Sequence, residues 1–228
     1  MAIEEEIKVR FLENPYVNDI ALIPLNRLLK DMKNQITQLS DLDMNGSYTY
    51  ADYLTWRLEE MVELIKGKIF KMSPAPNTFH QTVSGNLFAF LKAAIKEQKY
   101  KTFSVPTDLR LTTKGMDDVN IITVVQPDIF VVCDPAKLDD RGCLGSPDLI
   151  IEILSPATAT KDLTKKFDLY QESGVHEYWI VFPGDRIVET FYLENRVYKK
   201  TGVYAEDAMV PVRTLPGLEI LVTEIFEN

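Results

Sequence analysis

The sequence predicts an α/β (α+β) domain in which a mixed central sheet is flanked by helices. Residues 149–154 are apolar at both alternating positions, a pattern typical of a strand that is covered on both faces. Residues 77–99 repeat apolar side chains at helical spacing, which predicts an amphipathic helix. Helix- and strand-like segments then follow in the order helix, three strands, helix, strand. This order indicates a mixed sheet with helices packed against it.

The first part of the chain is predicted to be an extension of that domain. Residues 20–39 place apolar side chains at roughly helical intervals, and residues 41–47 have the composition of a loop. A length of 228 residues fits one large domain, or one domain with an extension, because typical domains hold ~100–200 residues. We therefore expect an N-terminal helical extension over residues 1–47 and one main domain over residues 48–228.

The elements of the main domain are expected in a simple order. A short helix in residues 49–58 precedes a hairpin in residues 61–72, which turns at Lys66-Gly67. Residues 73–77 break the chain before the amphipathic helix, whose expected N-cap is Asn77 or Thr78. The remaining expected elements are strands at 102–111, 124–132 and 148–154, a helix at 160–173 closed by Gly174, a strand at 177–182, and mostly strand and turn at 187–193, 197–203 and 219–222.

The composition is that of a soluble globular protein and argues against some partners. The chain has 25 Lys and Arg against 34 Asp and Glu, a net charge of −9, so its bulk field should not attract nucleic acid. Its apolar runs are far shorter than the ~20 residues that span a bilayer, and residues 4–6 are acidic where a signal peptide is basic. Cys133 and Cys143 are expected to be reduced. We expect a cytoplasmic protein without a membrane partner.

Two carboxylates stand in segments that the pattern predicts to be buried. With a side-chain period of two, Glu152 shares a face with Ile150 and Leu154, and Asp128 shares a face with Phe130. A buried, ionised carboxylate is costly unless it is paired, hydrogen-bonded or bound to metal. Two such acids on neighbouring strands favour one shared site, in which a divalent cation offsets their repulsion, and oxygen ligands favour Mg²⁺ or Mn²⁺. The alternative is that each acid lies at a strand end, solvated or paired with Lys or Arg.

A lysine accompanies the two acids. In the predicted helix the apolar stripe is Leu163, Phe167 and Tyr170, and Lys166 flanks this inward side, whereas Lys165 points away. An inward lysine beside carboxylates can hold a nucleophilic water or stabilise developing negative charge. The alternative is a snorkelling side chain whose ammonium group stays in solvent.

Together these motifs resemble the Uma-two family of proposed restriction endonucleases, a branch of the PD-(D/E)XK nuclease superfamily. The resemblance extends over about residues 48–193 and leaves the extension outside. Its motifs are Glu63-Leu64-Ile65-Lys66-Gly67, Met72-Ser73-Pro74, His80-Gln81, Pro127-Asp128, the run 147–156 around Glu152, the series Asp162, Lys166 and Tyr170 at four-residue steps, and the run 174–179.

The resemblance implies a restriction-endonuclease-like core and a Mg²⁺-dependent endodeoxyribonuclease. Asp128 and Glu152 would be catalytic, metal-binding acids, and Glu63 would be a further metal ligand. Two residues after Glu152 the family motif calls for lysine, but this chain has Leu154. The implied catalysis therefore needs a lysine that has migrated, and Lys166 is the candidate.

Further residues would support the site under the same resemblance. Tyr170 would brace it, and Asp162 and His80 match family positions. Two of the implied residues have a second interpretation. Glu63 could simply be a hairpin acid paired with a lysine, and His80 could be a satisfied, partly buried histidine.

The expected partners are DNA, a divalent metal and a second copy of the chain in a homodimer. Trp179 and its strand could pair subunits, or could simply be core. A second hypothesis is a catalytically silent nuclease-fold module for nucleic-acid or protein binding or oligomerisation, which Leu154 and the acidic balance favour. A third is a glycosidase that uses the two carboxylates as acid and base. Any DNA binding is expected to be weak, metal-dependent and salt-sensitive.

Overall fold

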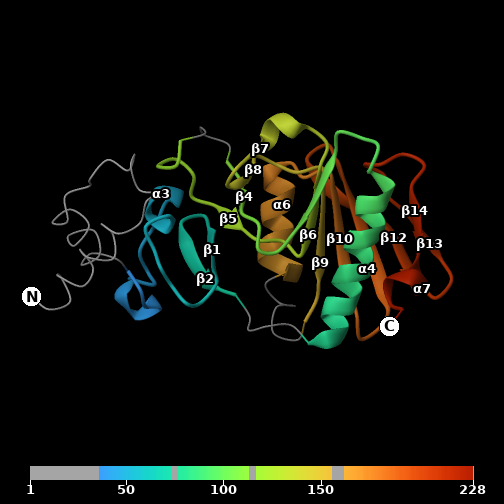
Figure 1. Ribbon diagram of the computed structural model, residues 1–228, viewed down its shortest axis with the longest axis horizontal. Helices are drawn as coiled ribbons and strands as arrows, with labels where there is room; N and C mark the ends of the chain where they lie inside the picture. Colours follow the sequence, from blue (N-terminus) through green and yellow to red (C-terminus); the bar gives the residue numbers. More distant parts are fainter. Residues whose placement is uncertain (1–35, 73–76, 113–116, 156–161, 228) are drawn as a thin grey trace, which may run out of the picture.

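Two six-stranded sheets with helices packed against them build the main part of the fold that the structure describes (Figure 1). The computed structural model describes residues 36–72, 77–112, 117–155 and 162–227, without the side chains of residues 162 and 163. Sheet A has the strand order β2-β1-β5-β4-β8-β7, and sheet B has the order β12-β11-β10-β9-β6-β3. The predicted α+β class with a mixed sheet flanked by helices is confirmed, because sheet B contains both parallel and antiparallel pairs. The division of the strands between two sheets was not predicted.

The strand bounds follow from the hydrogen-bond ladders. Sheet A contains β1 (Val62–Ile65), β2 (Lys68–Lys71), β4 (Leu109–Arg110), β5 (Val124–Val125), β7 (Leu138–Asp139) and β8 (Gly142–Leu144). Sheet B contains β3 (Lys101–Ser104), β6 (Ile129–Val132), β9 (Leu149–Ile153), β10 (Glu177–Phe182), β11 (Ile187–Glu194) and β12 (Val197–Ala205). A separate hairpin pairs β13 (Met209–Pro211) with β14 (Glu219–Leu221).

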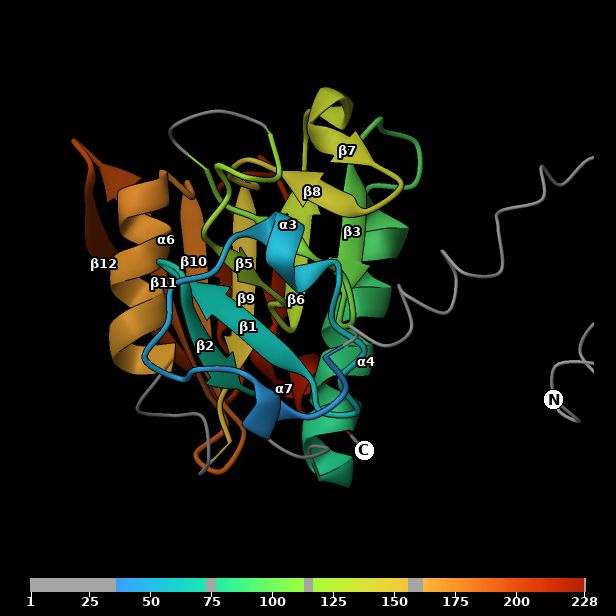
Figure 2. The same ribbon diagram turned by 90° about the vertical axis from the view of Figure 1, so that its left-hand side faces the viewer.

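The helices occupy separate layers. The helical elements are α3 (Tyr50–Tyr53), α4 (Thr78–Ala94), the π turn η3 (Asp162–Lys166), α6 (Phe167–Ser173), α7 (Val222–Ile225) and the 3₁₀ turns η1 (Leu39–Asp41) and η2 (Pro135–Lys137). Helix α6 lies between the two sheets, and α4 covers the far face of sheet B (Figure 1). Helix α3 packs on the far face of sheet A, at the front of the view in Figure 2.

Three buried clusters correspond to these layers. One cluster joins α4 to the outer face of sheet B through Val83, Leu87, Ile151 and Trp179. The middle cluster holds residues of both sheets and of α6, and a third joins α3 to the outer face of sheet A. Because the middle layer is enclosed by both sheets and a helix, any polar group placed there is removed from bulk water.

The amphipathic helix begins where the sequence predicts. The Asn77 side chain accepts a hydrogen bond from the His80 backbone N–H at 2.8 Å, which is the expected N-cap. The helix ends at Ala94, before the predicted end at residue 99. Helix α6 ends at Gly174, whose φ of 82° is the left-handed conformation that glycine favours at a helix end, as predicted.

Two predicted strands are each broken, and this is the main difference from the expected fold. The predicted strand 124–132 divides into β5 in sheet A and β6 in sheet B, and Gln126-Pro127-Asp128 lies between them. Proline cannot donate to a strand ladder, so Pro127 ends the pairing there. The predicted strand 102–111 divides in the same way around Pro106. The chain therefore passes from one sheet to the other beside Asp128.

The N-terminal predictions are only partly within the described residues. Residues 1–35 lie outside them, and most of the predicted extension helix falls there. The predicted helix at 49–58 is only α3, which is capped by the Thr49 side chain and ends at Tyr53. Leu42 is buried with Trp56 and Val62, so this part of the predicted loop packs on sheet A.

Trp179 lies in the core. Strand β10 pairs with β9 on one side and with β11 on the other, and Trp179 is completely buried. The suggestion that this strand pairs subunits is therefore wrong.

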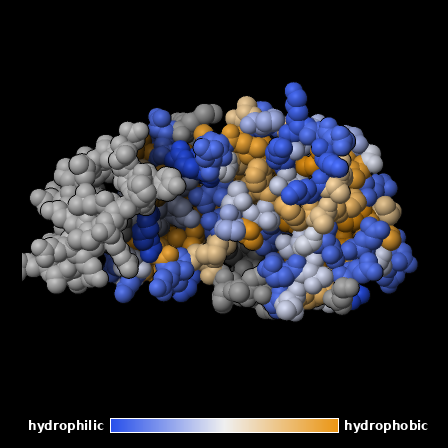
Figure 3. All heavy atoms as spheres, viewed as in Figure 1, coloured by the Kyte–Doolittle hydropathy of each residue, from blue (hydrophilic) through white to orange (hydrophobic). Residues whose placement is uncertain are grey.

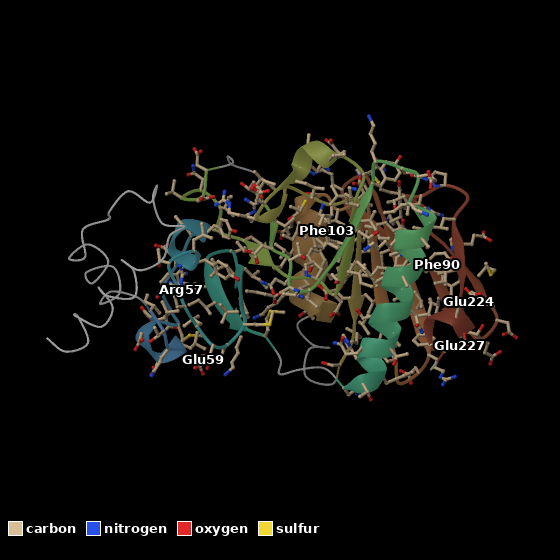
Figure 4. All side chains as sticks on the ribbon, in the orientation of Figure 1. Arg57, Glu59, Phe90, Phe103, Glu224 and Glu227 are labelled. Atoms are coloured by element: carbon tan, nitrogen blue, oxygen red, sulfur yellow. The ribbon has the colours of Figure 1, made fainter. Side chains whose placement is uncertain are left out.

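Within the described residues, the outer strands of sheet B are β3 and β12. Figure 3 shows apolar surface on the face where β3 and α4 lie, and Figure 4 shows Phe103 and Phe90 on that face. The homodimer itself stays a prediction.

Two other expectations concern the cysteines and the membrane. Both Cys133 and Cys143 are free thiols. None of the helices formed by the described residues has the length and apolar character needed to cross a bilayer.

Two glycines give a matched test of backbone packing. Gly142 has a φ of 114°, and a Cβ added there would lie 2.2 Å from the Asp108 backbone oxygen. We expect Gly142→Ala to lower the free energy of unfolding by at least about 2 kcal/mol, measured by urea unfolding. Gly85 lies in α4 with nothing within 4 Å of an added Cβ, so Gly85→Ala should raise stability by about 0.5–1 kcal/mol. Equal effects of the two variants would contradict this account.

Candidate active site

The two predicted acids lie opposite each other on neighbouring strands. The register pairs Ile129 of β6 with Ile151 of β9, so Asp128, directly before β6, stands opposite Glu152. The Ile153 backbone N–H donates to Asp128 Oδ2 at 2.8 Å, which fixes the Asp128 side chain against β9. Asp128 keeps 18% of its side chain exposed, whereas Glu152 is only 2% exposed. Asp128 is therefore partly accessible to solvent, whereas Glu152 is buried.

Lys166 turns inward and contacts two carboxylates at once. Its Nζ lies 2.8 Å from Glu152 Oε1 and 3.1 Å from Glu63 Oε1, and the residue is 3% exposed. Lys166 ends the π turn η3 directly before α6, which brings its side chain over the end of β9. The neighbouring Lys165 is exposed, as the helical spacing predicts. The ammonium group of Lys166 is thus held by acids from both sheets.

Tyr170 braces the same carboxylate from the next turn of the helix. Its hydroxyl donates to Glu152 Oε1 at 2.6 Å. Burial raises the pKa of Tyr170 well above its usual value of 10, and the charges of Glu152 and Glu63 raise it further. Tyr170 therefore stays protonated and remains a donor across the physiological range.

Glu63 lies in β1 and is completely buried. Its Oε1 accepts a hydrogen bond from the Gln126 backbone N–H at 3.1 Å and pairs with Lys166. This arrangement matches the interpretation of Glu63 as a hairpin acid paired with a lysine. Its role as a metal ligand stays a prediction.

His80 reaches the site from the other face of sheet B. Its Nε2 lies 2.9 Å from the Ile153 backbone oxygen and 3.6 Å from Asp128 Oδ2. The residue is 7% exposed, so it is a largely buried histidine that also borders the site. Asp162 lies in η3, but its side chain falls outside the described residues, so its supporting role is a prediction without a described geometry.

Sequence reasoning missed a group of residues behind Glu63. The Gln126 side chain donates to Asp108 Oδ1 at 2.9 Å, and the Tyr50 hydroxyl donates to Asp108 Oδ2 at 3.1 Å. Hydrogen bonds thus connect α3, through Gln126, to Glu63 and Lys166. Gln126 directly precedes Pro127-Asp128, but a single amide before a motif gives no signal of its own, and Asp108 has no motif at all.

The two carboxylates of the candidate site offer oxygen donors of the kind that hard divalent cations take. Within the part of the chain that the structure describes, no three His, Cys, Asp or Glu side chains form a group that could hold a metal ion. Zinc generally takes three or four such ligands, whereas Mg²⁺ uses one or two carboxylates and fills its remaining positions with water and phosphate oxygens. Asp128 and Glu152 are the two carboxylates that such a set would use, and a metal bound to them stays a prediction.

Known proteins share this arrangement of elements. The sequence model of the family Uma2, described as "putative restriction endonuclease", matches residues 50–223, which is more than half of the chain. The chain belongs to the Uma2 family. The family predicted from the sequence is therefore confirmed, and the match runs beyond the region in which the resemblance was seen.

One curated protein and one solved structure accompany the Uma2 match. The uncharacterised protein slr1290 of Synechocystis sp. is 25% identical over 146 residues, which is 63% of this chain and 73% of that protein. A crystal structure of a putative nuclease belonging to DUF820 from Anabaena variabilis matches with a TM-score of 0.60 and 24% identity. The match covers 78% of this chain and 97% of the chain of the Anabaena variabilis protein. At this identity the match shows a shared fold.

The buried tyrosines of this Uma2 protein predict its alkaline stability. Burial, helped by the charge of Asp108, raises the pKa of Tyr50 to about 12, and burial also raises those of Tyr53, Tyr170 and Tyr198. Because these folded values exceed the unfolded value of about 10, their stabilising effect is complete below pH ~10 and is lost as the pH rises through the folded values. We expect the free energy of unfolding to fall steeply above pH ~10. Urea unfolding across this range, with tyrosinate absorbance followed in parallel, measures it, and early titration of all tyrosines in the folded protein would contradict it.

Proposed function

We propose that this Uma2 protein is a metal-dependent endonuclease that hydrolyses phosphodiester bonds of DNA. The observation that carries the proposal is the placement of Asp128 and Glu152 opposite each other, with the Lys166 ammonium 2.8 Å from Glu152. Two acids and a lysine in one site are the groups that a hydrolytic nuclease needs to hold a cation and to stabilise negative charge. Membership of a family described as restriction endonucleases supports the same reaction.

Each residue of the candidate site has its own proposed role. Asp128 and Glu152 would hold Mg²⁺ or Mn²⁺, which when bound polarises the phosphate and lowers the pKa of a water. Lys166 would orient the attacking water or neutralise charge that develops on the phosphate. Tyr170 keeps the Glu152 carboxylate fixed by its 2.6 Å hydrogen bond. His80, 2.9 Å from the Ile153 oxygen, holds the end of β9 beside Asp128.

A cleavage assay tests the proposal directly. Plasmid and single-stranded DNA are incubated with the full chain and Mg²⁺ or Mn²⁺. We expect cleavage by the wild type, and a loss of at least about 100-fold in Asp128→Asn, because that change removes a charged ligand while keeping the shape of the side chain. Asp148→Asn is the matched control, since Asp148 lies near His176, with its nearest carboxylate oxygen 3.5 Å from His176 Nδ1, and takes no part in the proposed site. Identical products from wild type and Asp128→Asn would overturn the assignment.

A silent nuclease-fold module is the second candidate. It is favoured by Leu154, which occupies the position of the motif lysine and is buried in the middle cluster. It is also favoured by Lys166, whose ammonium already contacts two carboxylates. Calorimetric titration with Mn²⁺ separates the candidates. Binding that is lost in Glu152→Gln supports the nuclease, and its absence in the wild type supports the module.

A further inference from the structure

An aromatic side chain lies beside the candidate site. In the hairpin of sheet A, Phe70 of β2 is directly opposite Glu63 of β1. Directly opposed residues of an antiparallel pair project from the same face, so Phe70 lies on the face that carries the Glu63 carboxylate. Phe70 is only partly buried, and it packs against the middle cluster. Strand β2 is an outer strand of sheet A among the described residues, so this ring lies at the border of the site.

A lysine lies over the ring of Phe70. The Lys165 ammonium lies 4.2 Å from the centre of the Phe70 ring, within the range of a cation–π contact. Lys165 is exposed and is the chain neighbour of Lys166, whose ammonium contacts Glu152 and Glu63. The buried Lys166 therefore faces the acids, while the preceding residue, Lys165, places a second cation on an aromatic ring outside them. We call Phe70 and Lys165 the ring–ammonium pair.

The chemistry of the ring–ammonium pair suits a nucleotide. An exposed aromatic ring stacks on nucleobases of any sequence, and a neighbouring ammonium group binds the adjacent phosphate. The bases of a duplex are already stacked on each other, so a side chain at the mouth of a site reaches a base face only when the strand is unpaired. A stacking side chain at such a position discriminates between strand forms, whereas contacts to phosphate alone do not.

From this geometry we infer that the ring–ammonium pair binds a single-stranded nucleotide next to the scissile phosphate, which gives the enzyme a preference for single-stranded DNA. The inference rests on the proposed nuclease function and adds which form of DNA, single-stranded or duplex, the nuclease prefers. Phe70 stacks on the base, and Lys165 leaves the ring to contact the phosphate. Lys166 stays with the acids, so binding of the base and the chemistry of the phosphate use different residues.

Binding of DNA that resists hydrolysis tests the inference apart from catalysis. Fluorescence anisotropy is measured with the full chain, Mg²⁺ and phosphorothioate-linked oligonucleotides, single-stranded or duplex. We expect tighter binding of the single strand and a loss of about 5- to 150-fold in Phe70→Ala, which is the factor that corresponds to one base–aromatic stack. Phe70→Tyr should keep the affinity. Lys165→Ala should reduce the salt slope of single-strand binding by about 0.7, the value for one phosphate contact.

The chain offers a matched control pair. Lys92 lies 5.4 Å from the centre of the Phe88 ring on α4, which covers the opposite face of sheet B. Phe88→Ala and Lys92→Ala should leave single-strand binding unchanged. Phe70→Leu keeps an apolar side chain in the cluster but lacks a stacking face, so it should lose affinity even if Phe70→Ala does not fold.

The outcomes separate the two proposals. Equal binding of single strand and duplex, or full affinity in Phe70→Leu, overturns the inference and leaves the nuclease proposal intact. If the wild type binds neither form of DNA and cleaves neither, the proposed function itself fails and the inference fails with it. Tighter single-strand binding that depends on Phe70 but not on Phe88 supports the inference.

Discussion

Lys166→Met is expected to lower the free energy of unfolding by about 3–5 kcal/mol, because it removes the ammonium group that two buried acids contact. Glu63 and Glu152 are 0% and 2% exposed, and the Oε1 atoms of both lie within 3.1 Å of the Lys166 ammonium. Methionine fills the space of the lysine stem but brings no charge. Urea unfolding followed by tryptophan fluorescence measures the change.

Two comparisons test whether the loss of stability comes from the buried contacts of Lys166 with Glu63 and Glu152. Lys165→Met, one residue earlier, should change stability by less than about 1 kcal/mol, since the Lys165 side chain is exposed. The double variant Lys166→Met with Glu63→Gln should be more stable than Lys166→Met alone, because it removes one of the two repelling charges. A loss below about 1 kcal/mol in Lys166→Met would contradict the close contact of the three groups.

Glu177→Ala is expected to cost about 3–5 kcal/mol, for a different reason. Glu177 is 1% exposed and accepts three hydrogen bonds. The Trp179 indole N–H donates to it at 2.8 Å, the Arg213 backbone N–H at 3.1 Å and the Thr214 backbone N–H at 2.7 Å. Each buried donor left without an acceptor costs about 1–3 kcal/mol. Thermal and urea unfolding measure the loss.

A matched acid on the neighbouring strand is the control. Glu189 of β11 pairs with Lys200 at 2.8 Å, with 22% and 47% of the two side chains exposed. Glu189→Ala should therefore cost less than about 1 kcal/mol. Comparable losses for Glu177→Ala and Glu189→Ala would mean that the three buried donors find water, and that Glu177 does not anchor the segment between β13 and β14.

The sequence predicted the parts of the site that depend on local pattern. Glu152 stands out because it interrupts an apolar strand, and Lys166 is placed by the spacing of its own helix. The inward position of Lys166 follows from that spacing, and its ammonium contacts Glu152 in the structure. Gly174 ends α6 for an equally local reason. Local patterns are readable because each is decided within one element.

Other features depend on which segments meet, and these could not be predicted. The strand around Asp128 looked continuous, yet it divides between two sheets at Pro127. The pairing of Glu63 with Lys166 joins residues that are distant in sequence, and either of two interpretations of Glu63 fitted its hairpin. The hydrogen bond between Gln126 and Asp108 has no sequence pattern because both side chains act through tertiary contacts.

The crossing of the chain between the sheets has a consequence for folding. Sheet A takes β1, β2, β4, β5, β7 and β8, and sheet B takes β3, β6 and β9 from the same stretch of chain. Neither sheet can be completed from one continuous segment, so neither can form alone as an autonomous folding unit. We therefore expect one cooperative unfolding transition for the described region, and fragments ending between β5 and β6 should fail to fold. Because Glu63 comes from sheet A and Glu152 from sheet B, the geometry of the candidate site should appear only when the whole region is assembled.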